Sequence, residues 1–183
     1  MRELSLHILD MLENALEAGA TRVDLSIVED LGVDRLTIVV QDNGRGMDAE
    51  TARRALDPFF TTRTTRHVGL GLPLLTAAAR RCEGNLALES APGQGTTVRA
   101  SFRHNHLDRA PLGNLTDTLL AFLLSERGEI ELCYCHQVDG RAFEFDTAAI
   151  RAELGEVPLS HPQVREWLSE YIAEGEAELC RAD

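Results

Sequence analysis

Residues 6 to 21, LHILDMLENALEAGAT, have the apolar spacing of an amphipathic helix that ends at Gly19. His7, Asp10 and Asn14 are three and four positions apart, so they lie one above another on the same helix face. A carboxylate and a carboxamide stacked in this way can bind a common ligand. A polar stripe that faces solvent, opposite the core, has the same spacing. The residues outside this helix must decide between the two interpretations.

The pattern on either side of the helix predicts an α+β fold. Alternating apolar and polar residues predict four strands, which form two hairpins, at residues 21–30, 34–42, 84–90 and 96–102. Helical spacing predicts a short helix at residues 48–56, with Asp48 as its N-cap, and a longer one at 72–82. This order of elements predicts a two-layer sandwich, with helices on one face of a mainly antiparallel sheet.

The sandwich is expected to span residues 1–104, and the stretch HNHLDRAPLGN has the composition of a linker. Residues 105–183 are expected to form a small C-terminal module of hairpin and helices that packs on the first unit. Its hairpin joins EIELCYCHQ and RAFEFD through a turn at Asp139 and Gly140. A helix is expected before the hairpin and two more after it.

Composition excludes several classes of function. The chain has 183 residues, 44% of them hydrophobic, which is enough for a core. Its net charge is -12, which disfavours sequence-independent binding to nucleic acid and to anionic membranes. All 18 basic residues are Arg and none is Lys, so the chain can have neither the lysine of a P-loop nor a lysine Schiff base.

The four cysteines are few and unevenly spaced, which indicates reduced thiols and not a disulfide framework. Cys133, Cys135 and His136 could suggest a metal site, but the two cysteines lack the gap typical of zinc knuckles and are expected to pack on a strand. No apolar run is long enough to cross a membrane. We therefore expect a soluble, cytoplasmic protein.

The sequence has two glycine motifs, one directly after a predicted strand and one directly before a predicted helix. QDNGRGM, residues 41–47, places Asp42 at a strand end before two glycines, which suits either a small pocket or a plain turn. HVGLGLPLL, residues 67–75, places two glycines before a helix, where backbone N–H groups can bind an anion; an ordinary loop has the same composition. The order and spacing of all these motifs together favour a ligand site.

In this combination the sequence resembles the GHKL superfamily of ATP-binding domains. This superfamily includes sensor histidine kinases, gyrase-type topoisomerases, mismatch-repair ATPases and a heat-shock chaperone. The resemblance covers residues 3–103 and implies the Bergerat ATP-binding fold. LDMLENALEAGAT resembles the N box, DNGRGM the first glycine box, DPFFTTR the lid of histidine kinases, GLGLPLL the second glycine box and GQGTTVRASF the closing strand.

The resemblance implies ATP and Mg²⁺ as cofactors and assigns roles to individual residues. Asn14 would bind Mg²⁺ through its side-chain oxygen. Asp42 would accept a hydrogen bond from the adenine amino group, with Thr96 in support. Asp10 lies where many hydrolysing members have Glu, and it would be the catalytic base although it is one methylene shorter. The other residues implied at the nucleotide are Gly44, Gly46, Met47, Gly69, Leu70, Gly71 and Leu72, with Arg63 and Arg66 on a lid within residues 57–71.

Two hypotheses for function follow from the resemblance. The first is a histidine kinase-like phosphotransferase or ATPase that acts in signalling on a phosphoacceptor of another protein. The second is a non-catalytic, ATP-gated switch or adaptor that binds a partner protein through the C-terminal module. The PFFTTR segment favours the first, and the lack of a phosphoacceptor helix before residue 3 favours the second. A topoisomerase-like role on DNA is disfavoured by the net charge.

Overall fold

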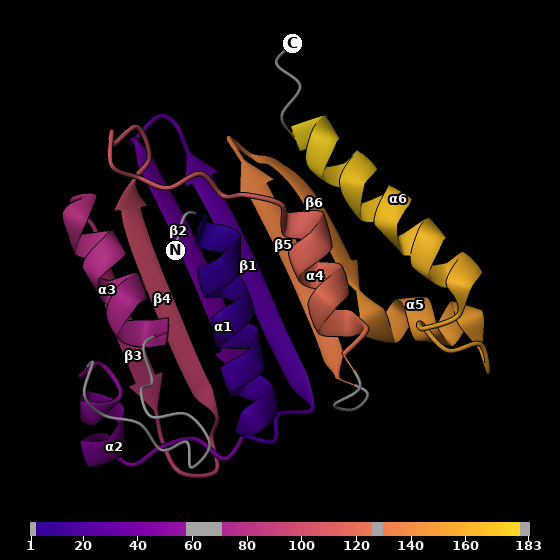
Figure 1. Cartoon of the computed structure of the whole chain (residues 1–183), viewed down its shortest axis with the longest axis horizontal. Coiled ribbons are helices and arrows are strands. Elements are labelled where there is room, and N and C mark those ends of the chain that lie inside the picture. The colour runs from indigo at the N-terminus through magenta and orange to yellow at the C-terminus, as the bar shows by residue number, and fades with distance from the viewer. Residues whose placement is uncertain (1–2, 58–70, 126–129, 180–183) are drawn as a thin grey trace.

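A six-stranded sheet, with the strand order β3-β4-β2-β1-β5-β6, connects all parts of the chain (Figure 1). The computed structural model describes residues 3–57, 71–125 and 130–179. The strands are β1 (Arg22–Asp30), β2 (Arg35–Asp42), β3 (Asn85–Ser90), β4 (Thr96–Arg103), β5 (Glu131–Val138) and β6 (Arg141–Asp146). The helices are α1 (Leu4–Glu17), α2 (Ala49–Arg54), α3 (Gly71–Arg81), α4 (Leu115–Leu123), α5 (Thr147–Leu154) and α6 (Pro162–Leu179).

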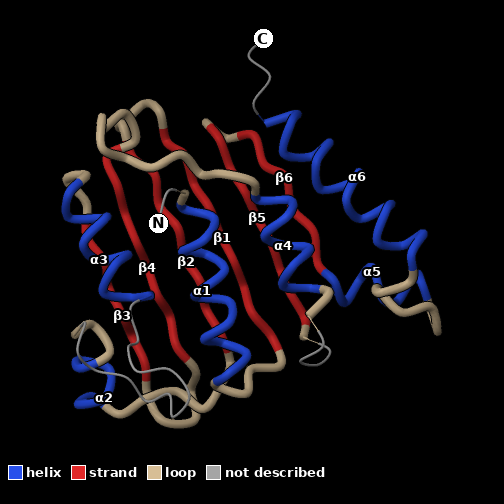
Figure 2. Tube along the Cα trace, in the orientation of Figure 1, coloured by secondary structure: helices blue, strands red, loops and turns tan. Residues whose placement is uncertain are grey.

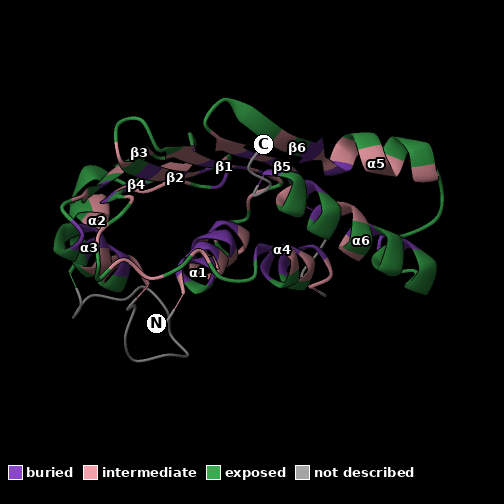
Figure 3. Ribbon diagram, turned by 90° about the horizontal axis from the view of Figure 1, so that it is seen from above, coloured by how far each residue is buried: buried purple, intermediate pink, exposed green. Residues whose placement is uncertain are grey.

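Helices α1, α3, α4 and α6 cover one face of the sheet, and the strands alternate accordingly (Figure 3). In β1 the side chains of Val23, Leu25 and Ile27 are buried toward the helices, while those between them are only half-buried. The Asp48 carboxylate accepts a hydrogen bond from the N–H of Thr51 at 2.7 Å and caps α2 as expected. The predicted two-layer α+β sandwich is confirmed.

The two predicted hairpins of the N-terminal part are also present, and they meet through β2 and β4 (Figure 2). Residues Asp139 and Gly140, both with positive φ, form the turn of the third hairpin, β5–β6. Two-residue turns of this kind match the twist of the paired strands. All three hairpins expected from the alternation are therefore confirmed.

The C-terminal segment extends the same sheet. Strand β5 pairs in parallel with β1, so that Arg22 lies beside Glu131, and α4 packs beside α1. One hydrophobic cluster accordingly contains Ile8 of α1 and both Leu119 and Phe122 of α4. The boundary expected at residue 104 falls in the segment that leads from β4 to α4.

A buried polar cluster fastens α6 to the sheet at the end of β1. His136 of β5 is 2% exposed and lies between two carboxylates: its Nε2 is 3.1 Å from Oε1 of Glu29, and its Nδ1 is 2.8 Å from Oε2 of Glu176 on α6. The Tyr134 hydroxyl donates to Glu176 at 2.6 Å, and His104 lies 2.5 Å from Glu29. Burial alone would lower the pKa of His136, but hydrogen bonds to the two carboxylates outweigh it and raise that pKa to about 9.

The packing beside this cluster is aromatic. The rings of Phe143 and Phe145 on β6 lie against Tyr171 of α6, and Trp167 stacks on Tyr171 with the two planes 9° apart. At Gly175 a Cβ atom would lie 2.3 Å from the Phe143 ring, so α6 can approach β6 only with glycine there. In the described ranges, no helix has the length and hydropathy needed to cross a membrane.

Candidate functional site

The candidate site lies where β2 ends and β4 begins, and the register places Asp42 beside Val23, at the opposite end of β1 from Glu29 of the His136 cluster. There the end of α1, at Ala18, contacts the turn after β2 at Gly44, β2 ends beside the start of β4, and α3 begins beside Asp10 of α1. The strand register places Asp42 of β2 directly beside Thr96 of β4. Three motifs that are far apart in the sequence therefore meet in one place.

Asp42 has the environment of a ligand-binding carboxylate. Its side chain is half-buried, and Oδ1 accepts a hydrogen bond of 2.7 Å from the N–H of Gly44. Burial raises the pKa of Asp42, and backbone N–H groups of Gly44 and Thr96 partly oppose that effect. The two N–H groups hold the carboxylate in place and leave it acceptor capacity for a donor ligand.

The glycines around Asp42 are required by close backbone packing. Gly46 has φ +65°, and a Cβ there would lie 1.9 Å from the carbonyl oxygen of Ala91. Gly95 has φ +78°, and a Cβ there would lie 1.8 Å from the carbonyl oxygen of Asp42. At Gly44 a Cβ would meet that of Ala18, at the end of α1, at 2.8 Å. These glycines thus allow two turns and a helix end to meet beside the carboxylate.

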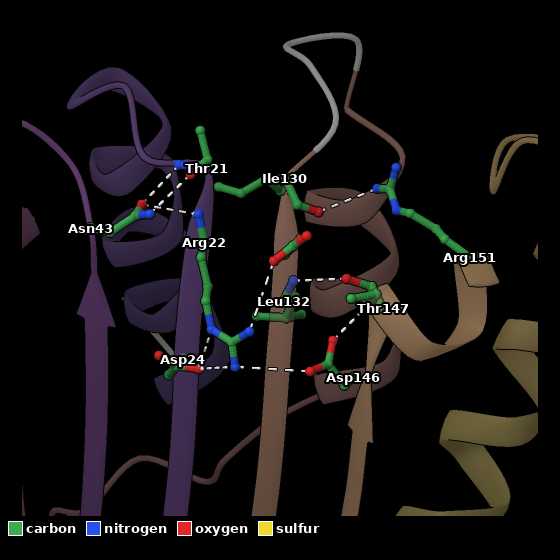
Figure 4. Close-up of polar contacts among 11 residues, drawn as sticks. Thr21, Arg22, Asp24, Asn43, Ile130, Leu132, Asp146, Thr147 and Arg151 are labelled. Atoms are coloured by element: carbon green, nitrogen blue, oxygen red, sulfur yellow. Dashed lines mark hydrogen bonds and ion pairs between the residues drawn. The ribbon is translucent and has the colours of Figure 1, made fainter.

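Asn43 anchors this turn to the start of β1, a role that the sequence motifs did not predict (Figure 4). Its side-chain oxygen accepts hydrogen bonds from the N–H groups of Thr21 and Arg22 at 2.9 and 3.0 Å, and its NH₂ group donates to the Thr21 hydroxyl at 2.9 Å. The guanidinium group of Arg22 in turn lies 3.2 Å from Asp24 and 3.8 Å from Asp146 of β6. These bonds join residues more than twenty positions apart, so no local sequence signal could have indicated them.

Ser90, the last residue of β3, is a second contributor that the sequence did not reveal. Its hydroxyl oxygen accepts a hydrogen bond of 2.8 Å from the N–H of Met47 and donates one of 2.9 Å to the carbonyl of Gly95. The Thr96 hydroxyl lies 3.0 Å away. Ser90 therefore joins the predicted base-binding residues Met47 and Thr96.

On α1, Asp10 and Asn14 are half-buried, and each has a polar partner. A Cβ built at Gly71 would lie 3.4 Å from the Asp10 carboxylate, so the first turn of α3 lies next to that group. His7 shares their face of the helix but is only 3% exposed, and its Nδ1 has no hydrogen-bond partner among the described residues. Burial lowers the pKa of His7 to about 4, so its ring is neutral at pH 7.

The other predicted residues divide into two groups. Gly71 and Leu72 begin α3, as the helix predicted for this region requires. Residues 58–70 of the predicted lid, which include Arg63, Arg66, Gly69 and Leu70, lie outside the described residues. Their assignment to the nucleotide stays a prediction.

Cys133 and Cys135 lie on β5 with side chains on the sheet face opposite the helices, whereas His136 points to the helix layer. Burial raises the pKa of both thiols, with neighbouring carboxylates adding to the effect. In the part of the chain that the structure describes, no three His, Cys, Asp or Glu side chains are placed to hold a metal ion.

Comparison with known proteins places the candidate site within a matched region. The family model described as histidine kinase-, DNA gyrase B- and HSP90-like ATPase matches residues 2–106. The sensor protein kinase FleS of Pseudomonas aeruginosa is 44% identical over 89 residues, which are 49% of this chain and 22% of FleS. The tetrathionate sensor histidine kinase TtrS of Salmonella typhimurium is 36% identical over 101 residues, which are 53% of this chain and 17% of TtrS.

A DNA repair protein is similar as well. The DNA mismatch repair protein MutL of Gemmatimonas aurantiaca is 40% identical over 98 residues, which are 49% of this chain and 16% of MutL. The chain thus spans less than a quarter of the length of each of these three relatives. The crystal structure of the N-terminal domain of a DNA repair protein matches with a TM-score of 0.53 at 16% identity, covering 79% of this chain and 52% of that one, which supports the fold.

Proposed function

Because the chain belongs to the histidine kinase-, DNA gyrase B- and HSP90-like ATPase family, we propose that its candidate site binds ATP with Mg²⁺. The observation that carries this proposal is the half-buried Asp42 carboxylate, which two backbone N–H groups hold in place. It lies next to glycines at which an added Cβ atom would clash with neighbouring atoms. A carboxylate accepts hydrogen bonds only, and the amino group of adenine donates them. The donor and acceptor pattern of the site therefore fits adenine.

The residues of α1 also fit a magnesium-bound nucleotide. Mg²⁺ prefers oxygen ligands and keeps several of its waters, and the Asn14 side-chain oxygen is a suitable single protein ligand. When bound, the ion would neutralise phosphate charge. Gly71 and Leu72 begin α3, where backbone N–H groups without helical partners favour an anion.

For the reaction, we propose a histidine kinase-like phosphotransferase or ATPase that acts on a partner protein in signalling. Asp10 is placed beside the first turn of α3, where the phosphates would lie, and it would accept a proton from the attacking water or acceptor hydroxyl. Similarity to the sensor kinases FleS and TtrS supports this reaction class. The net charge of -12 favours a protein as partner over nucleic acid or a membrane.

A non-catalytic, ATP-gated switch is the second candidate. It is favoured by the hydrogen bonds that join Asn43, next to Asp42, to Thr21 and Arg22, because the backbone of Thr21 also accepts from the N–H of Glu131 on β5. A change at the base site can therefore reach the C-terminal segment through few contacts. This segment would then bind or release the partner.

One experiment separates the two candidates. Purified protein is incubated with γ-labelled ATP and a lysate of its host, with Mg²⁺ or with EDTA. We expect Mg²⁺-dependent ATP binding together with either label on a partner protein or release of labelled phosphate. ATP binding without either product supports the switch, and equal binding with Mg²⁺ and EDTA contradicts the Mg²⁺ site.

A further inference from the structure

The hydroxyl group of Ser90 takes part in three polar contacts beside the proposed base site. The N–H of Met47 donates to its oxygen at 2.8 Å, and the hydroxyl itself donates to the Gly95 carbonyl at 2.9 Å. The third contact, at 3.0 Å, is with the hydroxyl of Thr96. A serine hydroxyl has one hydrogen, and here the Gly95 carbonyl takes it.

It follows that Thr96 is the donor in its contact with Ser90. The Thr96 hydrogen points toward β3, and the remaining lone-pair capacity of its oxygen is left for another donor. Ser90 therefore decides which way the Thr96 hydroxyl is oriented. Without the Ser90 oxygen, the Thr96 hydroxyl could rotate and donate to a ligand instead.

Ser90, Thr96 and Asp42 form a row across three adjacent strands. The register pairs Ser90 with Thr96 and Thr96 with Asp42. All three lie on the helix-covered face, because Val40 and Val98, two residues along β2 and β4, are buried in the core. The row thus places two acceptors, the Asp42 carboxylate and the oriented Thr96 hydroxyl, next to each other.

We propose that Ser90 is a specificity-determining positioning residue, which keeps the Thr96 hydroxyl an acceptor so that the site selects adenine over guanine. The inference rests on the proposed function, ATP binding at Asp42. Adenine has an amino group at position 6, which donates hydrogen bonds, and guanine has a carbonyl oxygen there, which accepts them. When position 6 of the base faces this row, each of the two acceptors can take one hydrogen of the adenine amino group, whereas the guanine carbonyl oxygen at that position faces two acceptors and no donor.

The test compares the dissociation constants of ATP and GTP for the full chain and five variants. Ser90→Ala should reduce the preference for ATP over GTP by about tenfold, because the freed Thr96 hydroxyl can donate to guanine. Ser90→Thr retains a hydroxyl and should restore the preference. Ser101→Ala is the matched control: Ser101 bonds Asn85 at the other end of the same hairpin, and its loss should leave the preference unchanged.

A double-mutant cycle tests whether Ser90 acts through Thr96. Thr96→Val removes the acceptor but leaves the Ser90 bonds to Met47 and Gly95, so it should also reduce the preference. Adding Ser90→Ala to Thr96→Val should then change nothing further. Thr96→Val also keeps the proposal testable if Ser90→Ala does not fold.

The outcomes separate this inference from the proposed function. If the parent protein binds no ATP, the proposed function fails and the inference with it. An unchanged ATP preference in Ser90→Ala or in Thr96→Val, with a parent that does discriminate, overturns the inference and leaves ATP binding intact. If Ser90→Ala has its full effect in the Thr96→Val background, Ser90 acts through Met47 or Gly95, and the inference is wrong.

Discussion

Asp42 is the residue on which the proposed nucleotide binding depends most directly. Replacing it by Asn keeps the size of the side chain but substitutes an NH₂ donor for one acceptor, so the adenine contact is lost or reversed. We expect Asp42→Asn to weaken ATP binding by about 2 kcal/mol, roughly 30-fold, measured by isothermal titration.

The matched control is Asp34→Asn. Asp34 lies just before β2, at the opposite end of this strand from Asp42, and forms an ion pair with Arg103. ATP affinity should be unaffected by that substitution. ATP and GTP affinities equal to those of the parent in Asp42→Asn would show that another group recognises the base.

Substitution of Asp10 distinguishes a catalytic site from a switch that only binds ATP. A general base typically contributes a hundredfold or more to rate, so Asp10→Asn should lower turnover by about that factor. ATP affinity should stay close to that of the parent, because Asn14 would still bind the metal. Single-turnover phosphate release or transfer, alongside equilibrium binding, measures both quantities.

Two further substitutions on α1 sharpen this prediction. Glu13→Gln removes a neighbouring carboxylate of the same helix and should leave turnover unchanged. Asp10→Glu has a longer reach, and turnover should rise if the short side chain is what limits the rate. Full turnover in Asp10→Asn would exclude Asp10 as the base.

At the scale of elements, the docking of α6 should depend on pH. The pKa of His136 is raised from 6.5 to about 9, so its contribution to stability is complete below pH 6.5 and is lost as pH rises through 9. The pKa of Glu29 is lowered, chiefly by its hydrogen bond to His136, so its contribution is lost as pH falls below about 4.5. Docking should therefore be strongest between about pH 4.5 and 6.5.

Hydrogen exchange across α6 measures this effect. After correction for intrinsic exchange, the free energy of opening should fall on the order of 2 kcal/mol between pH 6.5 and 9. His136→Gln should weaken docking and flatten the profile, whereas His161→Gln, an exposed histidine just before α6, should reproduce the parent. A profile in the parent as flat as that of His136→Gln would contradict the role of His136.

The sequence predicted most elements because their signals are local. The alternation in β1 and β2 and the turn at Asp139 and Gly140 needed no tertiary information. The parallel pairing of β1 with β5 was not predicted, because no residue of either strand specifies its neighbour. In the site, the glycines marked Asp42, whereas Ser90 acts through contacts that arise only when three strands are side by side.

At the scale of the whole molecule, the core does not divide at residue 104. Ile8 of α1 shares one hydrophobic cluster with Leu119 and Phe122 of α4, and β1 loses a hydrogen-bonded neighbour without β5. Removing residues 105–183 should therefore lower the melting temperature and promote aggregation, while the folded fraction still binds ATP. Thermal unfolding and ATP titration of the 1–104 fragment measure this.

A fragment that ends at residue 160 is the control, since it lacks α6 but keeps α4 and the β5–β6 hairpin. It should be more stable than the 1–104 fragment. If the 1–104 fragment is as stable as the full chain, residues 1–104 form an independent domain and the shared core contributes little. If it is folded but cannot bind ATP, the C-terminal segment completes the site.

The parallel pairing of β1 with β5 also has a consequence for the nascent chain. As the ribosome releases the protein from its N-terminus, β1 can pair with β2 at once, but its other edge has no partner until residues 131–138 emerge. An open strand edge is a template for pairing with another chain. For much of translation the sheet built by residues 1–104 is thus incomplete, and we expect the nascent chain to depend most on a chaperone during this interval.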